Sequence, residues 1–171
     1  MKAERGGVAK LVLDGARLSL EKDLGKIEDC LRRLSTKDIW WRPNVASNSA
    51  GNLCLHLCGN MRQWIISGLG GAADVRVRDE EFSEQGPLAR RVLVGRLRDT
   101  VREAGRVLER LPAGALTRNY AIQGFHVTGY GAVAQVVQHF SYHAGQIIYL
   151  TKMRGGRDLR LTTLSAVTKA R

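Results

Sequence analysis

The amino-acid sequence predicts an all-α protein, a four-helix bundle with long crossover connections. Apolar residues recur at steps of three and four in four separate segments, which is the pattern of amphipathic helices. Two of the connections are longer than the loops of an up-down bundle, so we expect them to cross over. A chain of 171 residues has the size of one domain. We therefore expect a single domain over residues 1–171, with a core at about 10–153 and a basic C-terminal tail at 154–171.

The first predicted helix covers about residues 10–34. Its buried stripe repeats at steps of four and three and consists of Leu20, Leu24, Ile27, Leu31 and Leu34. The helix should end before Pro43, because a proline disfavours helical backbone in the residue that precedes it.

The second predicted helix covers about residues 48–67. Asn48 or Ser49 can cap its start, since either side-chain oxygen can accept a hydrogen bond from a free backbone N–H of the first turn. A cluster of glycines that begins at Gly68 is expected to end it.

The third predicted helix starts near Pro87, a residue suited to the first helical turn, and ends before Pro112. The last predicted helix covers about residues 129–153. Thr128 is its candidate cap, and the glycines at 155–156 should terminate it.

Two irregular connections separate these helices. The first, about residues 70–86, is polar and carries a charged run at 75–81. A connection of this length could form a lid or rim over a functional site; we interpret it instead as a plain surface crossover. The second, about residues 112–127, contains a short piece with the character of extended chain, too short to build a sheet alone.

The composition limits the classes of partner. Lysine and arginine number 27 against 16 acidic residues, a formal charge of +11 that favours anionic partners. The charge is spread along the chain and no recognised DNA-binding motif is present, so nucleic acid is not the expected partner. No apolar run approaches the roughly 18 residues needed to span a membrane, and the first residues lack the apolar core of a signal peptide. We expect a cytoplasmic protein that acts on a small molecule.

Three histidines indicate a metal site. His139 and His143 are four residues apart on a predicted helix and therefore lie on one face, one turn apart, where both imidazoles can reach one ion. His56 lies in the second predicted helix, at the edge of its apolar stripe. Three imidazoles leave one position of a tetrahedral ion open, as in catalytic sites. The alternative is that these are partly buried histidines with ordinary hydrogen bonds.

Several other polar residues are candidates around such a site. Asn60 lies one turn beyond His56 and could hold a metal-bound water or a substrate carbonyl. Gln135 and Gln146 lie about one turn on either side of the histidine pair and could orient its imidazoles. His126 could be a fourth ligand or a base, although a surface position is the simpler interpretation.

The cysteines near His56 do not fit the same site. The chain has three, Cys30, Cys54 and Cys58, which match no disulfide framework and are expected to be free thiols. On a helix that advances about 100° per residue, Cys54 and Cys58 point away from His56. The site should therefore contain imidazoles alone.

The chain resembles the DinB-like, YfiT-like superfamily of metal-dependent bacterial proteins, and is most similar to one of its uncharacterised branches. The stretches that carry the resemblance are residues 40–44 (WWRPN), 49–64 (SAGNLCLHLCGNMRQW), 78–82 (RDEEF), 122–125 (IQGF) and 139–147 (HFSYHAGQI). They occur in the expected order and cover nearly the whole chain.

The resemblance implies a four-helix bundle, commonly a homodimer, with a divalent ion, often nickel or zinc, on histidines that map onto His56, His139 and His143. It also implies an acidic residue just before the first histidine of the pair, where this chain has Gln138. Some superfamily members are similar to S-transferases that use the thiols bacillithiol or mycothiol. We therefore expect a divalent-metal-dependent enzyme that joins a small-molecule thiol to an electrophile. The alternatives are a metal-dependent hydrolase and a non-catalytic metal-binding stress-response protein.

Overall fold

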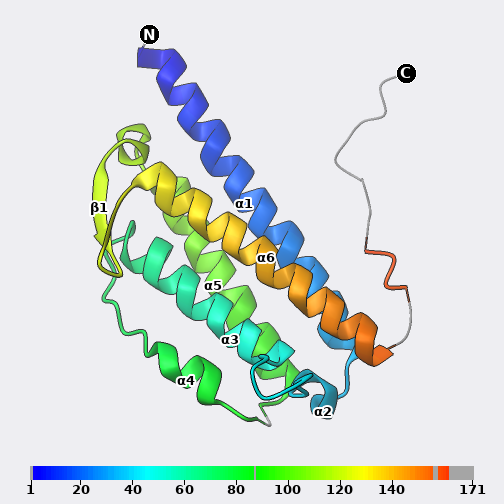
Figure 1. Cartoon of the computed structure of the whole chain (residues 1–171). Helices are drawn as coiled ribbons and strands as arrows, with labels where there is room; N and C mark the ends of the chain where they lie inside the picture. The colour runs from blue at the N-terminus through cyan, green and yellow to red at the C-terminus, as the bar shows by residue number, and fades with distance from the viewer. Residues whose placement is uncertain (1, 87, 156–157, 162–171) are drawn as a thin grey trace, which may run out of the picture.

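The protein is an all-α bundle of long helices, as the sequence predicts (Figure 1). The computed structural model describes residues 2–86, 88–155 and 158–161. The long helices are α1 (Lys2–Arg33), α3 (Ala50–Met61) with its continuation η1 (Arg62–Ser67), α5 (Arg90–Arg110) and α6 (Gly129–Gly155). Helix α1 packs against α5 and α6, and α3 packs against the same two helices from the opposite corner of the bundle.

The core lies between these helices and consists of the predicted stripes. Its largest fully buried side chains include Leu20, Ile27, Leu31, Leu57, Met61, Leu93, Leu97, Leu108 and Phe140. Each position falls on the inward face of its helix because the apolar spacing follows the helical repeat. No helix among the described residues is long and apolar enough to cross a membrane.

Two of the helix starts follow the predicted caps. The Ser49 hydroxyl accepts a hydrogen bond from the backbone N–H of Asn52, and the Asn52 side chain accepts one from the Ser49 N–H, which completes a capping box at the start of α3. Thr128 Oγ1 accepts a hydrogen bond of 3.0 Å from the Gly131 N–H at the start of α6. The sequence therefore predicts the starts of the two helices that later carry the functional residues.

The other boundaries differ in detail. Helix α1 begins at Lys2 rather than near residue 10, and the continued repeat places Ala9 and Leu13 in the core. Helix α5 begins at Arg90, later than the predicted start near Pro87, which itself lies outside the described residues. The last turn of the second predicted helix is the π-helix η1, whose wider backbone spacing periodicity alone does not reveal. Most of the predicted basic tail also lies outside the described residues.

The two connections contain short elements that the sequence predicts only in part. Residues 70–86 include α4 (Arg78–Ser83), where no helix was expected, and a further short helix, α2 (Thr36–Ile39), follows α1. Residues 112–127 contain the 3₁₀ turn η2 (Ala113–Leu116) and the predicted extended piece, which is an antiparallel hairpin of β1 (Asn119–Ile122) and β2 (Phe125–Thr128). Its turn residues, Gln123 and Gly124, both have positive φ, as a two-residue hairpin turn requires.

Candidate metal centre

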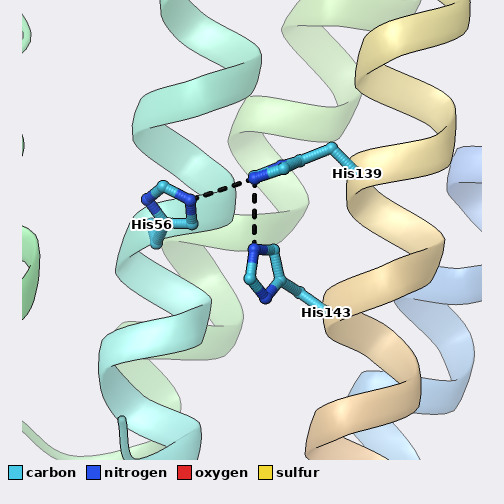
Figure 2. Close-up of side chains that lie close together, drawn as sticks. All are labelled: His56, His139 and His143. Carbon is cyan, nitrogen blue, oxygen red and sulfur yellow. Dashed lines mark hydrogen bonds between the residues drawn. The ribbon is translucent and has the colours of Figure 1, made fainter. Parts of the chain in front are cut away.

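The three predicted ligands meet between α3 and α6 (Figure 2). His139 Nε2 lies 3.1 Å from His56 Nε2 and 3.1 Å from His143 Nε2. All three candidate ligand atoms lie within 4.8 Å of one another. Residues 83 positions apart in the chain are thus brought to one point, because α3 and α6 pack side by side in the bundle.

Hydrogen bonds at the outer nitrogens set which imidazole nitrogens face the centre as bases. His56 Nδ1 is 2.8 Å from Glu81 Oε2; an ionised carboxylate can only accept, so Nδ1–H donates and Nε2 keeps a lone pair. His143 Nδ1 is 2.7 Å from Gln146 Oε1 and donates to that amide oxygen in the same way. Both rings therefore present a lone pair to the centre, the form in which imidazole binds a metal.

The donor set fits a divalent ion. A proton on His139 Nε2 could form a hydrogen bond to only one of the two lone pairs that face it, whereas a cation among the three nitrogens would interact favourably with all of them. With Zn–N bonds of about 2.0–2.1 Å, two nitrogens of a tetrahedral site stand roughly 3.3 Å apart, close to the 3.1 Å separations from His139. The three-histidine cluster is thus compatible with a metal-binding protein.

Burial keeps the α6 histidines unprotonated. Desolvation, with the nearby charges of His143, His56 and Arg76, lowers the pKa of His139 from 6.5 to about 4. Desolvation also lowers the pKa of His143. Both rings are therefore neutral near pH 7, so an ion does not have to displace a proton from either. His139 Nδ1 is buried, and none of the described residues accepts its hydrogen bond.

A buried ion pair holds the outer side of His56. Arg76 binds Glu81 through both ends of its guanidinium group, with Nε 2.7 Å from Oε1 and Nη2 2.8 Å from Oε2. The side chains are only 3% and 9% exposed. Arg76 Nη1 also donates to Gln63 Oε1, at 2.9 Å. Burial raises the pKa of Glu81, but hydrogen bonds from Arg76 and His56 outweigh it and lower the net pKa. Glu81 therefore stays ionised.

The backbone of α4 is fastened to α3 by a polar clamp. The Asn52 amide Nδ2 donates to the carbonyls of Glu81 and Glu84, at 3.0 and 2.7 Å. Arg42 Nη2 donates to Asn52 Oδ1 at 2.9 Å and to the Phe82 carbonyl at 2.8 Å. The clamp holds Glu81 opposite His56 although the two residues lie on different elements.

Close approach of α4 also requires a glycine on α3. A Cβ at Gly59 would lie 1.8 Å from Glu81 Oε1 and 2.9 Å from Arg76 Nε, so any side chain there would displace the ion pair. Gly59 lies one turn beyond His56, on the side of α3 that faces the crossover connection.

These contacts correct the interpretation of residues 70–86. The prediction of a plain surface crossover is wrong for Arg76 and Glu81, whose side chains are buried against the histidine cluster. The sequence did not reveal this role, because a charged run is usually a solvated face. The available signal was Gly59, an isolated glycine inside a predicted helix, which often marks a close approach. Gln138, which stands where the resemblance implies an acidic residue, is exposed, and a carboxylate that contacts the cluster is that of Glu81.

Of the other polar residues suggested by the sequence, all of them described in the structure, only Gln146 makes a polar contact with one of the three histidines. Gln146 lies within hydrogen-bond distance of His143, a contact through which it could orient this imidazole. Asn60 is buried and Gln135 half-buried, but no hydrogen bond between described residues joins either one to the histidines. His126 is exposed on β2 and is not part of the cluster.

The thiols also stay outside the cluster, as predicted. Burial raises the pKa of Cys58 to about 11 and the pKa of Cys54 well above its ordinary value. Both side chains are therefore protonated, a form that does not bind metal ions.

Comparisons with known proteins agree with this architecture. The family described as "Protein of unknown function (DUF1572)" matches residues 8–168. None of the curated proteins matches the sequence. A crystal structure of a conserved protein from Enterococcus faecalis is similar with a TM-score of 0.73 and 14% identity, over 84% of this chain and 97% of that chain.

Two further crystal structures are those of DinB-like proteins. The one from Bacillus cereus has a TM-score of 0.67 and 15% identity, over 83% of this chain and 92% of that chain. The one from Bacillus subtilis has a TM-score of 0.64 and 16% identity, over 84% and 94%. At these identities the likeness shows a shared fold, the DinB-like helical bundle that the sequence resemblance implies.

Proposed function

Since the chain belongs to the DUF1572 family of proteins of unknown function, we propose that it is a divalent-metal protein whose ion is held by His56, His139 and His143. We further propose that it uses this ion to join a small-molecule thiol to an electrophile. The observation that carries the first proposal is the convergence of three Nε2 atoms, two of them from rings whose Nδ1–H is already engaged.

The residues of the centre fall into two groups, the three histidines and the two side chains that hydrogen-bond to them. The three imidazoles would bind the ion and leave a position open for a ligand. Glu81 and Gln146 hold the Nδ1 protons of His56 and His143, which fixes the tautomer and the direction of each ring. Nickel and zinc both accept imidazole ligands, so the donor set suits either one.

Charge supports a thiol as the ligand of the open position. Three neutral imidazoles leave the ion its full charge, and the charges of Arg76 and Glu81 cancel one another. A bound ion would supply positive charge that favours thiolate over thiol, and the thiolate is the nucleophilic form. In the transfer, the sulfur lone pair forms a bond to an electrophilic carbon, the leaving group departs with its bonding electrons, and the thiol proton passes to solvent.

Elemental analysis of untagged protein is the first experiment. We expect about one nickel or zinc ion per chain, and its loss in His139→Ala and in His143→Ala. His126→Ala is the matched control, because it removes an exposed histidine outside the cluster. Folded wild-type protein that takes up no ion after reconstitution with several divalent metals would refute the metal centre.

Activity is tested on the loaded protein. Conjugation of bacillithiol or mycothiol to 1-chloro-2,4-dinitrobenzene is expected to depend on the metal and on His139. Hydrolysis of activated esters without thiol transfer would instead favour the metal-dependent hydrolase, in which the ion activates water. Loaded protein without either activity would favour the non-catalytic metal-binding role. Sedimentation equilibrium would check the homodimer that the resemblance implies.

A further inference from the structure

A second concave site lies beside the histidine cluster. The loop at residues 43–48 and the C-terminal half of α6 enclose a pocket of about 650 Å³, which also reaches Leu53 on α3. Pockets that bind drug-sized molecules span about 300–1,000 Å³, so the volume suits a small organic molecule. Tyr142 and Tyr149 line its wall and are 65% and 66% exposed. The pocket therefore opens directly to solvent.

The lining is free of formal charge. None of the described residues that line the pocket is Asp, Glu, Lys or Arg, although such residues make up 25% of the chain and its net charge is +11. Polar atoms come only from neutral groups, among them Ser47, Asn48 and the Gln146 amide. A charged ligand would lose water in this pocket without gaining a counter-charge. The lining therefore suits a neutral, largely apolar molecule that can stack on a phenol ring and make a few hydrogen bonds.

Residues that line the pocket also contact the histidine cluster. Gln146 lines the pocket and accepts the hydrogen bond from His143 Nδ1, and the Tyr142 ring lies 5.1 Å from the His143 ring, centroid to centroid. Leu53 precedes His56 by three residues and Gln146 follows His143 by three, which is about 4.5 Å along each helix axis. Pocket and cluster thus occupy neighbouring turns of the same two helices.

We propose that this pocket binds a neutral, largely apolar small molecule and, resting on the proposed function, that the bound molecule acts on the three-histidine centre through Gln146, which lines the pocket and holds the outer nitrogen of His143. Gln146 connects the two sites, because a ligand that contacts its amide also changes the hydrogen bond that orients His143. A second copy of the chain is the competing occupant, since exposed tyrosines also occur at protein interfaces.

Fluorescence titration of metal-free protein with N-phenyl-1-naphthylamine tests the pocket by itself. We expect saturable binding of about one probe per chain, tighter than that of 8-anilino-1-naphthalenesulfonate, the anionic probe with the same ring system. The net charge of +11 would favour the anion at a non-specific site, so a preference for the neutral probe identifies the uncharged pocket. Tighter binding of the anion would overturn the proposal.

Two neighbouring substitutions locate the probe. Ala46→Asp places a carboxylate in the pocket lining, whereas Val45→Asp makes the same charge change at a fully exposed residue outside this pocket. We expect the dissociation constant to rise at least about tenfold in the first variant and less than about twofold in the second. Circular dichroism checks that both are folded. Equal effects, or no saturable binding by folded wild-type protein, would refute the pocket.

The connection to the centre is measured on cobalt(II)-loaded protein. Saturation with N-phenyl-1-naphthylamine should change the visible cobalt spectrum, and Gln146→Leu should abolish this change while the probe still binds. An unchanged spectrum in the wild type would overturn the role at the centre. Probe binding to a protein that takes up no cobalt would refute the proposed function and leave the pocket standing. Displacement of the probe as the protein dimerises, abolished by Ala46→Asp, would assign the surface to a second copy.

Discussion

His56 and His143 lie on opposite sides of the histidine cluster, and different kinds of group hold their outer nitrogens. His56 donates to Glu81, a buried carboxylate that is itself paired with Arg76 and reaches the site from the crossover connection. His143 donates to Gln146, a neutral amide three residues further along the same helix. One support is charged and distant in sequence, and the other is uncharged and local.

The difference predicts unequal costs for changes on the two sides. A local amide is positioned by the helix that carries it, so its removal disturbs little else. The Glu81 carboxylate depends on the clamp from Asn52 and Arg42 and neutralises a buried guanidinium group. A change at Glu81 should therefore affect both the stability of the protein and the orientation of the His56 imidazole. A change at Gln146 should affect mainly the orientation of the His143 imidazole.

The largest effect is expected from a substitution that breaks the buried ion pair of Arg76 and Glu81. Glu81→Ala leaves Arg76 buried without a counter-charge, and we expect the free energy of unfolding to fall by about 3 kcal/mol. Asp99→Ala is the control, because it breaks the exposed pair with Arg102 and should cost only a small fraction of that amount. Urea denaturation of both variants measures the difference. Equal losses would show that the buried pair contributes no more than an ordinary surface pair.

The second largest effect is expected on metal affinity, which should fall more when the partner of His56 is changed than when the partner of His143 is changed. Glu81→Gln keeps the size of the side chain but weakens the acceptor for His56 Nδ1–H, and we expect the affinity to fall by roughly tenfold to a hundredfold. Gln146→Leu removes the neutral acceptor of His143 and should cost about tenfold or less. Competition with a chromogenic chelator gives both constants. A larger loss in Gln146→Leu would reverse the ranking of the two supports.

A smaller effect is expected of pH on the stability of the metal-free protein, which should fall as the pH is lowered. Unfolded His139 gains a proton below about pH 6.5, whereas the folded residue, whose pKa is about 4, stays neutral until lower pH. Between these values the unfolded state holds more protons, so the stability of metal-free protein falls as the pH drops from 6.5 towards 4. The lowered pKa of Glu81 acts in the same direction, but below pH 4.5.

The variant His139→Gln should reduce the fall below pH 6.5 without abolishing it, because the pKa of His143 is lowered as well, and it should leave the contribution of Glu81 unchanged. Unfolding curves measured across this range check the prediction. An identical slope in wild type and variant would show that His139 does not carry the effect.

The smallest expected effect concerns the far face of α3. Cys58 is a half-buried, protonated thiol whose pKa is raised to about 11, so Cys58→Ala should leave metal content unchanged. Elemental analysis beside His143→Ala makes the comparison direct. A lost ion in the cysteine variant would mean that the thiol side of α3 contributes to the centre after all.

Local signals explain most of what could be predicted. The spacing of His139 and His143, the cap at Ser49 and the direction of Cys58 away from His56 all follow from the geometry of one helix, which residues a few positions apart determine. Gln146 could be predicted as a neighbour of His143 for the same reason, since it lies one turn further along the same helix. The position of His56 relative to that pair needed one further assumption, that α3 and α6 are neighbours in a four-helix bundle.

The buried role of Arg76 and Glu81 could not be predicted in this way. Their run of charges has the composition of a solvated connection, and nothing local distinguishes the one acid that is buried from its exposed neighbours. Helix α4 is short, and it is held in place by Asn52 and Arg42 rather than by an apolar stripe of its own. Such a contact depends on where two distant segments dock.

The sequence by itself determined the helical fold, the caps of α3 and α6 and the three histidines, because periodicity and i,i+4 spacing act within a single helix. Only the tertiary structure decided that Glu81 and Arg76 complete the surroundings of His56, and that an uncharged pocket opens beside His143. Both features arise where separate segments pack together, and the energies that place them belong to contacts between residues far apart in the chain.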